Sequence, residues 1–191
     1  LHHPVRRLPR HDGAAQGGDF MRIGIIAAAV LAGSVLAGCV ERQPTTVAFS
    51  VEEAAFIKKS GTGVITGHAF RTKPSGTVVN AAGQIVHLVP ATSFARERFA
   101  NLYGKSKYIP HRAYPGNDTP DPGYVEHTRA VKAEANGRFA FDKVAPGTYF
   151  VSTQVIWGDE NAFTREGGLV YDTVTLTGQE TEPVQVILSG H

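Results

Sequence analysis

Short segments rich in β-branched and aromatic residues recur between residues 63 and 188, and turn-forming residues separate them. Segments of this kind, four to ten residues long and bounded by Gly, Pro, Asn or Asp, predict strands. Seven segments fit: residues 63–71, 83–89, 128–135, 138–141, 148–157, 168–177 and 183–188. The composition agrees, since 21 Gly and 11 Pro among 191 residues favour a turn-rich β protein. We therefore expect an all-β chain folded as a single antiparallel Greek-key sandwich of about seven strands, with one or two short helices.

A regularly spaced set of residues follows the third predicted strand. Asn136-Gly137 is a strong signal for a two-residue hairpin between residues 128–135 and 138–141. The set itself comprises Gly137, Phe139, Phe141, Val144, Pro146, Gly147, Tyr149 and Val151. It resembles the signature of carboxypeptidase regulatory-like (transthyretin-like) domains, and the resemblance extends over most of residues 63–188. It implies a prealbumin-like domain at residues 63–191 in which Phe139, Phe141, Tyr149 and Val151 point into the core. Such domains occur in many unrelated proteins, so no activity is implied.

An export signal precedes the predicted strands. Residues 21–38 contain Met21, one basic residue, an apolar run over 23–36 and small residues before Cys39. The run is shorter than the ~20 apolar residues of a membrane-spanning helix. Leu36-Ala37-Gly38-Cys39 resembles the lipobox of bacterial lipoproteins, which implies cleavage between Gly38 and Cys39 and lipid attachment to Cys39. That lipid would be a thioether-linked diacylglycerol with a fatty acyl group on the new amino group. An ordinary signal peptide is the alternative.

These features predict a location in the cell envelope, where the lipid anchors the chain to a membrane. In a Gram-negative host, Val40 after the cysteine is compatible with the outer membrane, with the domain facing the periplasm. Residues 1–20 have no periodicity, and residues 16–19 can be encoded by a ribosome-binding sequence, so we expect them to be untranslated and Met21 to be the start. The first 38 residues hold four of the 19 Lys and Arg and two of the 17 Asp and Glu. The remainder therefore carries 15 of each and no net charge, which argues against a nucleic-acid partner.

One short helix is predicted before the strands and a second between two of them. Residues 39–62 form a lipid-attached segment that begins as a polar tether over 40–49. Ser50-Val-Glu-Glu53 resembles a capping box and predicts a helix that reaches Lys59. Ser93 is the expected N-cap of a second helix over 94–103.

The loop after the second helix carries the candidate binding residues. Residues 105–125 are too proline-rich for a central strand and too long for a simple connector. Aromatic and cationic side chains gather here, as they do at surfaces that bind glycans, anions and proteins. The candidate residues are Tyr103, Lys105, Lys107, Tyr108, His111, Arg112 and Tyr114. A self-packed loop that covers a sheet edge explains the same composition.

The sequence contains few signs of catalysis or of a metal site. The histidines His68, His87, His111, His127 and His191 form no H-x-H or H-E-x-x-H pair. Ser60 and Ser75 lack the G-x-S-x-G elbow. The chain ends without the Tyr-Arg-Gly-Ser motif of transthyretin-like hydrolases, and the residues typical of a ferric intradiol dioxygenase lack that family's spacing. Those residues are Tyr103, Tyr108, His111 and His127. We expect no enzyme, no metal and no cofactor apart from the covalent lipid.

The expected function is that of a membrane-anchored envelope lipoprotein whose sandwich binds or scaffolds another protein without catalysis. Two alternatives stay open. One is an envelope-glycan binding module, with peptidoglycan as the expected ligand. The other is a metal-dependent enzyme of the sandwich superfamily.

Overall fold

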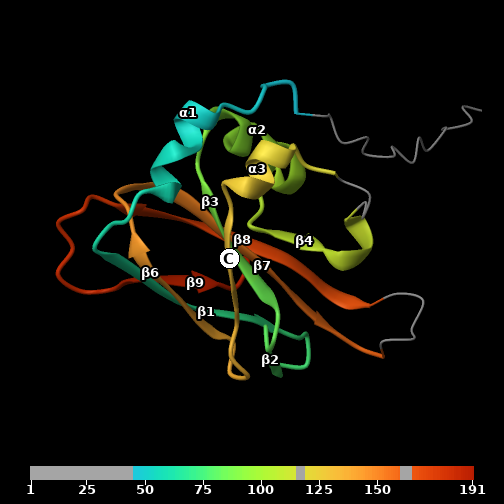
Figure 1. The fold of residues 1–191 in the computed structure, drawn as a ribbon. Coiled ribbons are helices and arrows are strands. Elements are labelled where there is room, and N and C mark those ends of the chain that lie inside the picture. Colours follow the sequence, from blue (N-terminus) through green and yellow to red (C-terminus); the bar gives the residue numbers. More distant parts are fainter. Residues whose placement is uncertain (1–44, 115–118, 160–164) are drawn as a thin grey trace, which may run out of the picture. The chain divides into compact units, whose positions relative to one another are not determined.

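The computed structural model describes residues 45–114, 119–159 and 165–191, and within them nine strands form two sheets packed face to face (Figure 1). The all-β sandwich is thereby confirmed. The strands are β1 (Gly63–Thr72), β2 (Val78–Asn80), β3 (Ile85–Pro90), β4 (Tyr108–Pro110), β5 (Arg129–Lys132), β6 (Arg138–Val144), β7 (Gly147–Trp157), β8 (Glu166–Leu176) and β9 (Val184–Leu188). The helices are α1 (Val51–Ala54), the 3₁₀ turn η1 (Ala55–Lys58), α2 (Ser93–Tyr103), the 3₁₀ turn η2 (His111–Ala113) and α3 (Pro122–Glu126).

The two sheets differ in how their strands run. In the five-stranded sheet the order is β4-β8-β7-β3-β5, and every neighbour is antiparallel. In the other sheet β1 pairs with β6 and, at its end, with β2 in the antiparallel sense, but β9 runs parallel to β1. The antiparallel arrangement expected from the sequence is therefore found in the strand pairs of both sheets except β1–β9, which is parallel. The chain crosses from β8 to the other sheet before β9, and such a crossover permits a parallel pair.

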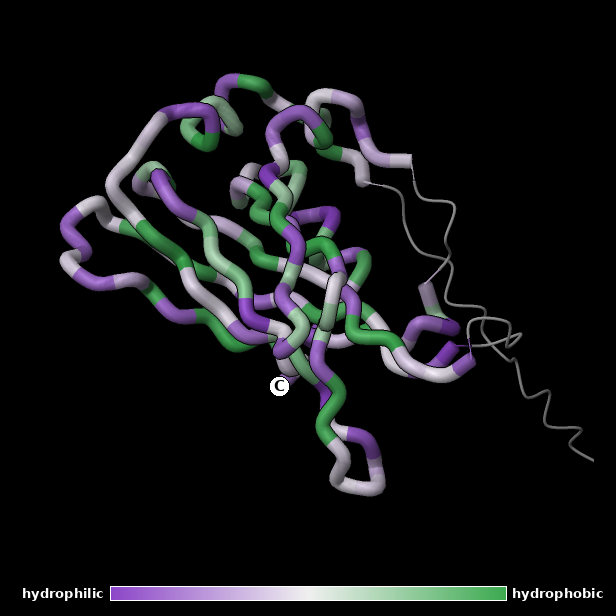
Figure 2. The backbone as a smooth tube through the Cα atoms, turned by 60° about the horizontal axis from the view of Figure 1, so that its bottom comes forward, coloured by the Kyte–Doolittle hydropathy of each residue, from purple (hydrophilic) through white to green (hydrophobic). Residues whose placement is uncertain are grey.

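The core lies between the sheets and follows the period of two along each strand. Phe139 and Phe141 of β6 and Tyr149 and Val151 of β7 are buried in it, as the sequence predicts. Figure 2 shows hydrophobic and hydrophilic residues alternating along the strands. This alternation fixes the register, because a shift by one residue would turn every apolar side chain away from the core.

The turn at Asn136-Gly137 differs from the expected two-residue hairpin. Gly137 N–H donates to the Glu134 carbonyl at 2.9 Å, and Glu134 N–H donates to the Arg138 carbonyl at 2.8 Å. The loop therefore contains three residues, with Gly137 in the left-handed region at φ +79°. Beyond this single pair the two strands separate, because β5 joins β3 while β6 joins β1 in the opposite sheet.

The starts of α1 and α2 are linked. Ser50 caps α1 as expected, because its hydroxyl accepts a hydrogen bond from Glu53 N–H at 3.2 Å. The Glu53 carboxylate turns outward and accepts from the Ser93 N–H at 2.7 Å and from its hydroxyl at 3.1 Å. Ser93 is consequently the first residue of α2, and Thr92 is its N-cap, with Ala95 N–H donating to the Thr92 hydroxyl. The expectation that Ser93 caps this helix is wrong by one position.

The segment before α1 packs onto the sandwich. The Glu97 carboxylate of α2 accepts hydrogen bonds from the backbone N–H groups of Thr46 and Val47 at 2.8–3.1 Å. Phe49 packs edge-on against Phe94 and Tyr124, with ring centroids 5.8 and 6.4 Å apart. The last part of the predicted tether is therefore docked on α2, while residues 39–44 lie outside the described part of the chain.

Candidate functional site

Helix α2 packs on the outer face of the five-stranded sheet. Phe99 stacks on Phe150 of β7 with ring centroids 4.3 Å apart, and Tyr103 lies 5.6 Å from Phe99 and 4.2 Å from Tyr171 of β8. Together with Val89 and Ile109, these rings form a second, smaller apolar cluster outside the main core. Figure 1 shows α1, α2 and α3 gathered on the same side of the strands. The cluster fixes α2 over part of the outer sheet face and leaves the neighbouring part uncovered.

A groove occupies this uncovered part of the outer face. It consists of two adjoining hollows of about 360 and 400 Å³, which share His87, Tyr103, Tyr114, Ser152 and Leu169. The wall along the helices also includes Arg98, Phe99, Leu102, Pro120, Tyr124 and Val125, and the floor along the strands includes Gln84, Ala130 and Gln154. A concave, largely apolar surface with a few convergent polar groups is typical of small-ligand sites.

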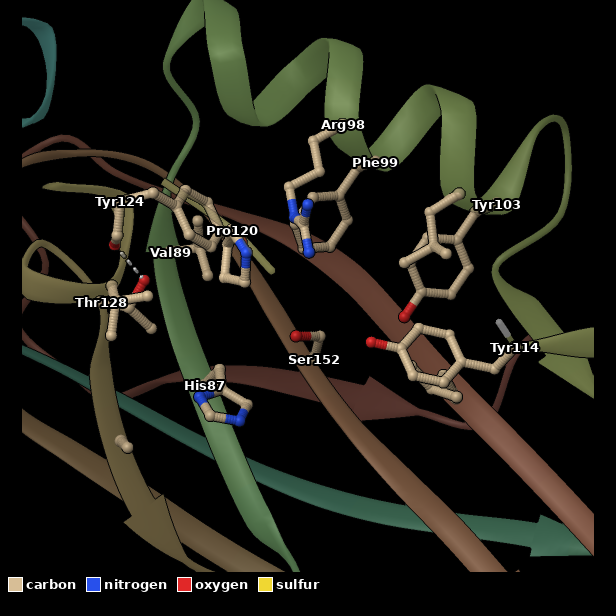
Figure 3. Close-up of a pocket in the computed structure, with 14 residues that line it drawn as sticks. His87, Val89, Arg98, Phe99, Tyr103, Tyr114, Pro120, Tyr124, Thr128 and Ser152 are labelled. Carbon is tan, nitrogen blue, oxygen red and sulfur yellow. Dashed lines mark hydrogen bonds between the residues drawn. The ribbon is translucent and has the colours of Figure 1, made fainter. Parts of the chain in front are cut away.

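The polar groups on the floor come from adjacent strands. His87 of β3 and Ser152 of β7 are directly paired across the sheet, so their side chains project into the groove side by side. Figure 3 shows the hydroxyls of Tyr103, Tyr114 and Ser152 directed toward the same space. Within the described residues, no protein group is hydrogen-bonded to the His87 ring or to the Ser152 and Tyr114 hydroxyls. These groups are free to bond a ligand.

His87 is held in its neutral form by its surroundings. Although the side chain is exposed in the groove, the surrounding walls remove part of its hydration, and this desolvation lowers its pKa below 6.5. This lowered pKa favours the neutral ring at pH 7. A neutral imidazole donates a hydrogen bond from one ring nitrogen and accepts one at the other. A hydroxyl group can also donate and accept, so the two groups can pair in either direction.

Hydrogen bonds within the protein hold the floor and the wall of the groove in position. Gln154 on β7 donates to the Gln84 amide oxygen at 2.8 Å, and the Thr153 hydroxyl donates to the Ile85 carbonyl at 2.7 Å. On the opposite side, the Thr128 hydroxyl donates to the Tyr124 carbonyl at 2.9 Å (Figure 3). A site with walls fixed in this way loses little conformational entropy on binding.

The candidate loop residues are divided between this groove and a second hollow. Tyr103 and Tyr114 line the groove, whereas Tyr108, His111 and Arg112 line the second hollow on the other side of η2. Lys107 forms a salt bridge with Asp172 at 2.9 Å, and Lys105 is exposed and lines neither hollow. The expectation of one exposed cluster is therefore wrong, most clearly for Tyr103, which is buried. The competing expectation of an edge cover is met in part, because β4 pairs with the edge of β8.

Sequence reasoning missed the floor of the groove. His87 enters the sequence analysis only as a histidine without a metal-binding motif and Ser152 does not enter it, although both lie opposite to the inward set on their strands. Val86 and Leu88 flank His87, and Val151 flanks Ser152; all three are buried in the core. Period-two counting could have placed both polar residues on one outer face. It could not show that α2 and Tyr114 would enclose them.

The other histidines are dispersed. His68 hydrogen-bonds the Asn80 side chain at 2.9 Å, and the buried His127 ring contacts the Gly123 carbonyl at 2.8 Å. The four residues considered for a ferric site are not brought together: Tyr103 lies in the groove, Tyr108 and His111 in the second hollow, and His127 on α3's end. Among the described residues, no three His, Cys, Asp or Glu side chains are grouped so as to hold a metal ion.

The predicted export signal at residues 21–38, the cleavage position at Gly38 and the lipid site at Cys39 lie outside the described residues. So do residues 1–20. Across the described ranges, no helix has the length and apolar character needed to cross a membrane.

Comparison with known proteins identifies one informative likeness. The chain is similar to the crystal structure of a proposed carbohydrate binding protein from Pseudomonas aeruginosa, with a TM-score of 0.61 and 29% sequence identity. The match covers 75% of this chain and 98% of that one. No family model matches the chain, and no curated protein matches its sequence. The likeness supports the two-sheet fold and, at a coarse level, a binding module.

Proposed function

We propose that this chain is a non-catalytic carbohydrate-binding module and that the groove beside α2 is its site. One observation carries this proposal: aromatic rings and polar groups line the same concave surface. The rings of Tyr114 and Tyr124 lie on its walls, and the polar side chains of His87 and Ser152 lie on its floor. The likeness to the Pseudomonas aeruginosa protein supports the same ligand class.

The chemistry of a sugar fits the two kinds of surface. The C–H groups of a pyranose ring carry slight positive charge and pack on the electron-rich face of an aromatic ring. Tyr103 already stacks on its protein neighbours, whereas Tyr114 is half-buried and retains ring surface in the groove. We therefore assign the stacking role to Tyr114. Sugar hydroxyls can then bond with His87, Ser152 and the hydroxyl of Tyr114.

The charged residues that line the groove favour binding of a saccharide without its hydrolysis. Glycosidases generally use two carboxyl groups that flank the scissile bond. Among the described lining residues there is no Asp or Glu, and Arg98 is the permanently charged group. A neutral or acidic saccharide is therefore the preferred ligand.

Peptidoglycan is the envelope glycan that we propose as the ligand. This step rests on the lipobox-like Leu36-Ala37-Gly38-Cys39, which would hold the module at a membrane and raise its effective concentration near envelope polymers. The lipid anchor predicts that the Cys39→Ala variant is lost from the membrane fraction of the host. A Cys39→Ala chain that still sediments with membranes contradicts the lipoprotein proposal.

The site is tested by retention of the full chain on purified peptidoglycan. We expect Tyr114→Ala to reduce the affinity by about tenfold, since aromatic packing contributes roughly 0.5–1.5 kcal/mol beyond the buried area and a tenfold change corresponds to about 1.4 kcal/mol. Tyr114→Phe keeps the ring and should lose less. The matched control is Ile187→Ala, which truncates an exposed apolar residue of β9 on the opposite sheet. Equal retention of Tyr114→Ala and the unmodified chain would refute the groove as the site.

A crosslinking experiment separates the glycan proposal from the protein-binding expectation. A photoreactive amino acid at position 114 places the probe in the groove, whereas position 108 lies in the second hollow with its phenol donating to Gly167. A muramidase-sensitive ladder in cells supports glycan binding. A discrete protease-sensitive adduct favours a protein partner.

A further inference from the structure

The second hollow has a different chemical character from the groove. Its volume is about 660 Å³, and it lies where the end of β1, the β4–η2 segment and the adjoining ends of β7 and β8 meet. Among the described residues that line it, five are basic and one, Glu166, is acidic. The basic residues are Arg71, Lys73, His111, Arg112 and Arg165. This concentration of positive charge is notable in a chain whose residues 39–191 carry no net charge.

Three nitrogen atoms of this hollow are buried without a hydrogen-bond partner. They are Arg71 Nε, Arg165 Nε and His111 Nδ1, and they are the buried unpaired side-chain nitrogens and oxygens of the described residues. A buried polar group without a partner has lost its hydration and gained no hydrogen bond in return, so such groups are rare and call for an explanation. All three belong to residues that line the same hollow.

Within the described ranges, the structure shows no salt bridge to the arginines of the hollow. The Glu166 carboxylate accepts a hydrogen bond from Trp157 Nε1 at 3.1 Å, and within the described ranges none of Arg71, Arg112 and Arg165 forms a salt bridge. Basic residues elsewhere do form such pairs: Lys107 with Asp172, and Arg129 with Asp142.

Aromatic rings and a backbone carbonyl fix the cations in position. The Arg71 guanidinium donates to the Ser189 carbonyl and lies 4.0 Å above the centre of the Tyr108 ring. The Lys73 ammonium lies 5.4 Å from the centre of the Trp157 ring. A guanidinium held in this way presents its remaining N–H groups in a fixed fork, which suits the oxygen atoms of an oxyanion.

We propose that this hollow binds a tetrahedral oxyanion, a phosphate or sulfate group, on a small ligand. Four permanent cations exceed what one singly charged carboxylate would balance, whereas a phosphate or sulfate offers several acceptor oxygens and up to two charges. The guanidinium groups of Arg71, Arg112 and Arg165, which line the hollow, then have oxygen atoms to which they can donate. The site shares no lining residue with the groove, so it is independent of the proposed glycan binding.

The chain carries its own reporter for this site. Trp157 is the single tryptophan of the sequence and lines the hollow. The full chain is titrated with sodium phosphate, sodium sulfate and glucose 6-phosphate, at an ionic strength held constant with NaCl, while Trp157 emission is followed. We expect a saturable change in Trp157 emission. Comparison of the sulfate and phosphate titrations shows which oxyanion binds more tightly. The glucose 6-phosphate titration shows whether a phosphate ester also binds.

Charge-removing variants assign the effect to the hollow. Arg165→Gln and Arg112→Gln should each weaken binding by about tenfold, the effect of losing one charge-assisted contact. The control Lys105→Gln removes the same charge from an exposed residue outside the hollow and should leave the affinity unchanged. Tyr114→Ala should also leave it unchanged. Two results would overturn the proposal. One is a change in Trp157 emission that NaCl alone reproduces, and the other is the same affinity in Arg165→Gln, Arg112→Gln and Lys105→Gln.

Discussion

The hydroxyl of Tyr149 shows how one polar atom is accommodated in the core. Tyr149 is fully buried on β7, and its hydroxyl donates to the Ala145 carbonyl four residues upstream at 2.8 Å. Burial raises the pKa of this phenol to about 12, so it remains a neutral donor at ordinary pH. The bond ties the start of β7 to the segment that crosses from β6 in the other sheet.

Removing this hydroxyl tests its contribution to stability. Tyr149→Phe should lower the free energy of unfolding by about 1–2 kcal/mol, since the Ala145 carbonyl loses a buried partner. Urea unfolding measures the change. The matched variant is Tyr171→Phe, because within the described residues the Tyr171 hydroxyl has no protein partner. A loss for Tyr171→Phe as large as that for Tyr149→Phe would show that the bond to Ala145 is not the cause.

Glu97 makes the docking of the N-terminal segment dependent on pH. Hydrogen bonds from the Val47 backbone and from Thr46 lower the pKa of this carboxyl below 4.5. Because the folded-state pKa is depressed, the stabilisation is present above the ordinary carboxyl range and is lost as the pH falls through the lowered value. We expect the exchange protection factor of the Val47 amide to be lower at pH 3 than at pH 7.

Two references make that measurement specific. The Ala69 amide, which donates to the Gly137 carbonyl inside the sandwich, should keep its protection at both pH values. Glu97→Gln should remove most of the pH dependence at Val47. Unchanged protection of Val47 between pH 7 and pH 3 in the unmodified chain would contradict the role given to Glu97.

At the scale of single residues, the sequence predicts buried strand positions better than site positions. Phe139, Phe141 and Val151 follow from period two alone. Tyr103 was expected at an exposed surface because it adjoins a cationic loop, yet it lies four residues after Phe99 on α2 and packs against it. Whether an aromatic residue near a helix end packs or projects depends on the sheet beneath it, which local sequence does not specify.

Among the elements, α2 determines the groove because it carries Phe99 and Tyr103. Its first turn depends on Thr92, whose buried hydroxyl accepts from Ala95 N–H at 3.2 Å. Both Thr92 and Ser93 are suitable capping residues, so sequence alone could not choose between them. The choice is made by Glu53 on α1, which engages the Ser93 backbone and hydroxyl.

The position of the cap is tested by paired variants. Thr92→Ala should lower the free energy of unfolding by about 1 kcal/mol, the usual cost of losing an N-cap. Ser93→Ala removes an exposed bond and should cost less than about 0.5 kcal/mol. Thermal unfolding of both variants gives the comparison. A larger loss for Ser93→Ala would reverse the assignment of the cap.

The predictability of the elements depended on their length and on long-range pairing. The seven expected strands are present, while β2 and β4, each three residues long, were missed. Pro110 in β4 correctly argued against a central strand, and β4 lies at a sheet edge. The assignment of β5 and β6 to different sheets could not follow from Asn136-Gly137, because a turn signal specifies a local reversal and not the partners of the flanking strands.

At the scale of the whole molecule, the candidate groove arises from segments far apart in the sequence. His87, Tyr114 and Ser152 belong to separate elements, and only the sandwich brings them together. The resemblance to carboxypeptidase regulatory-like domains implied the fold without locating this surface. Under the proposed function, the sandwich is a scaffold, while α2 and the segment after it convert one outer sheet face into a binding site.

The most direct test of carbohydrate binding in the groove is backbone amide NMR of the full chain during titration with a soluble disaccharide–peptide fragment of peptidoglycan. We predict saturable shift changes concentrated at His87, Tyr114 and Ser152, with the residues of β1 and β9 unaffected. The same titration of Tyr114→Ala should require about tenfold more ligand for half-saturation. Changes confined to the second hollow around Trp157, or no saturable change at any residue, would contradict the central claim.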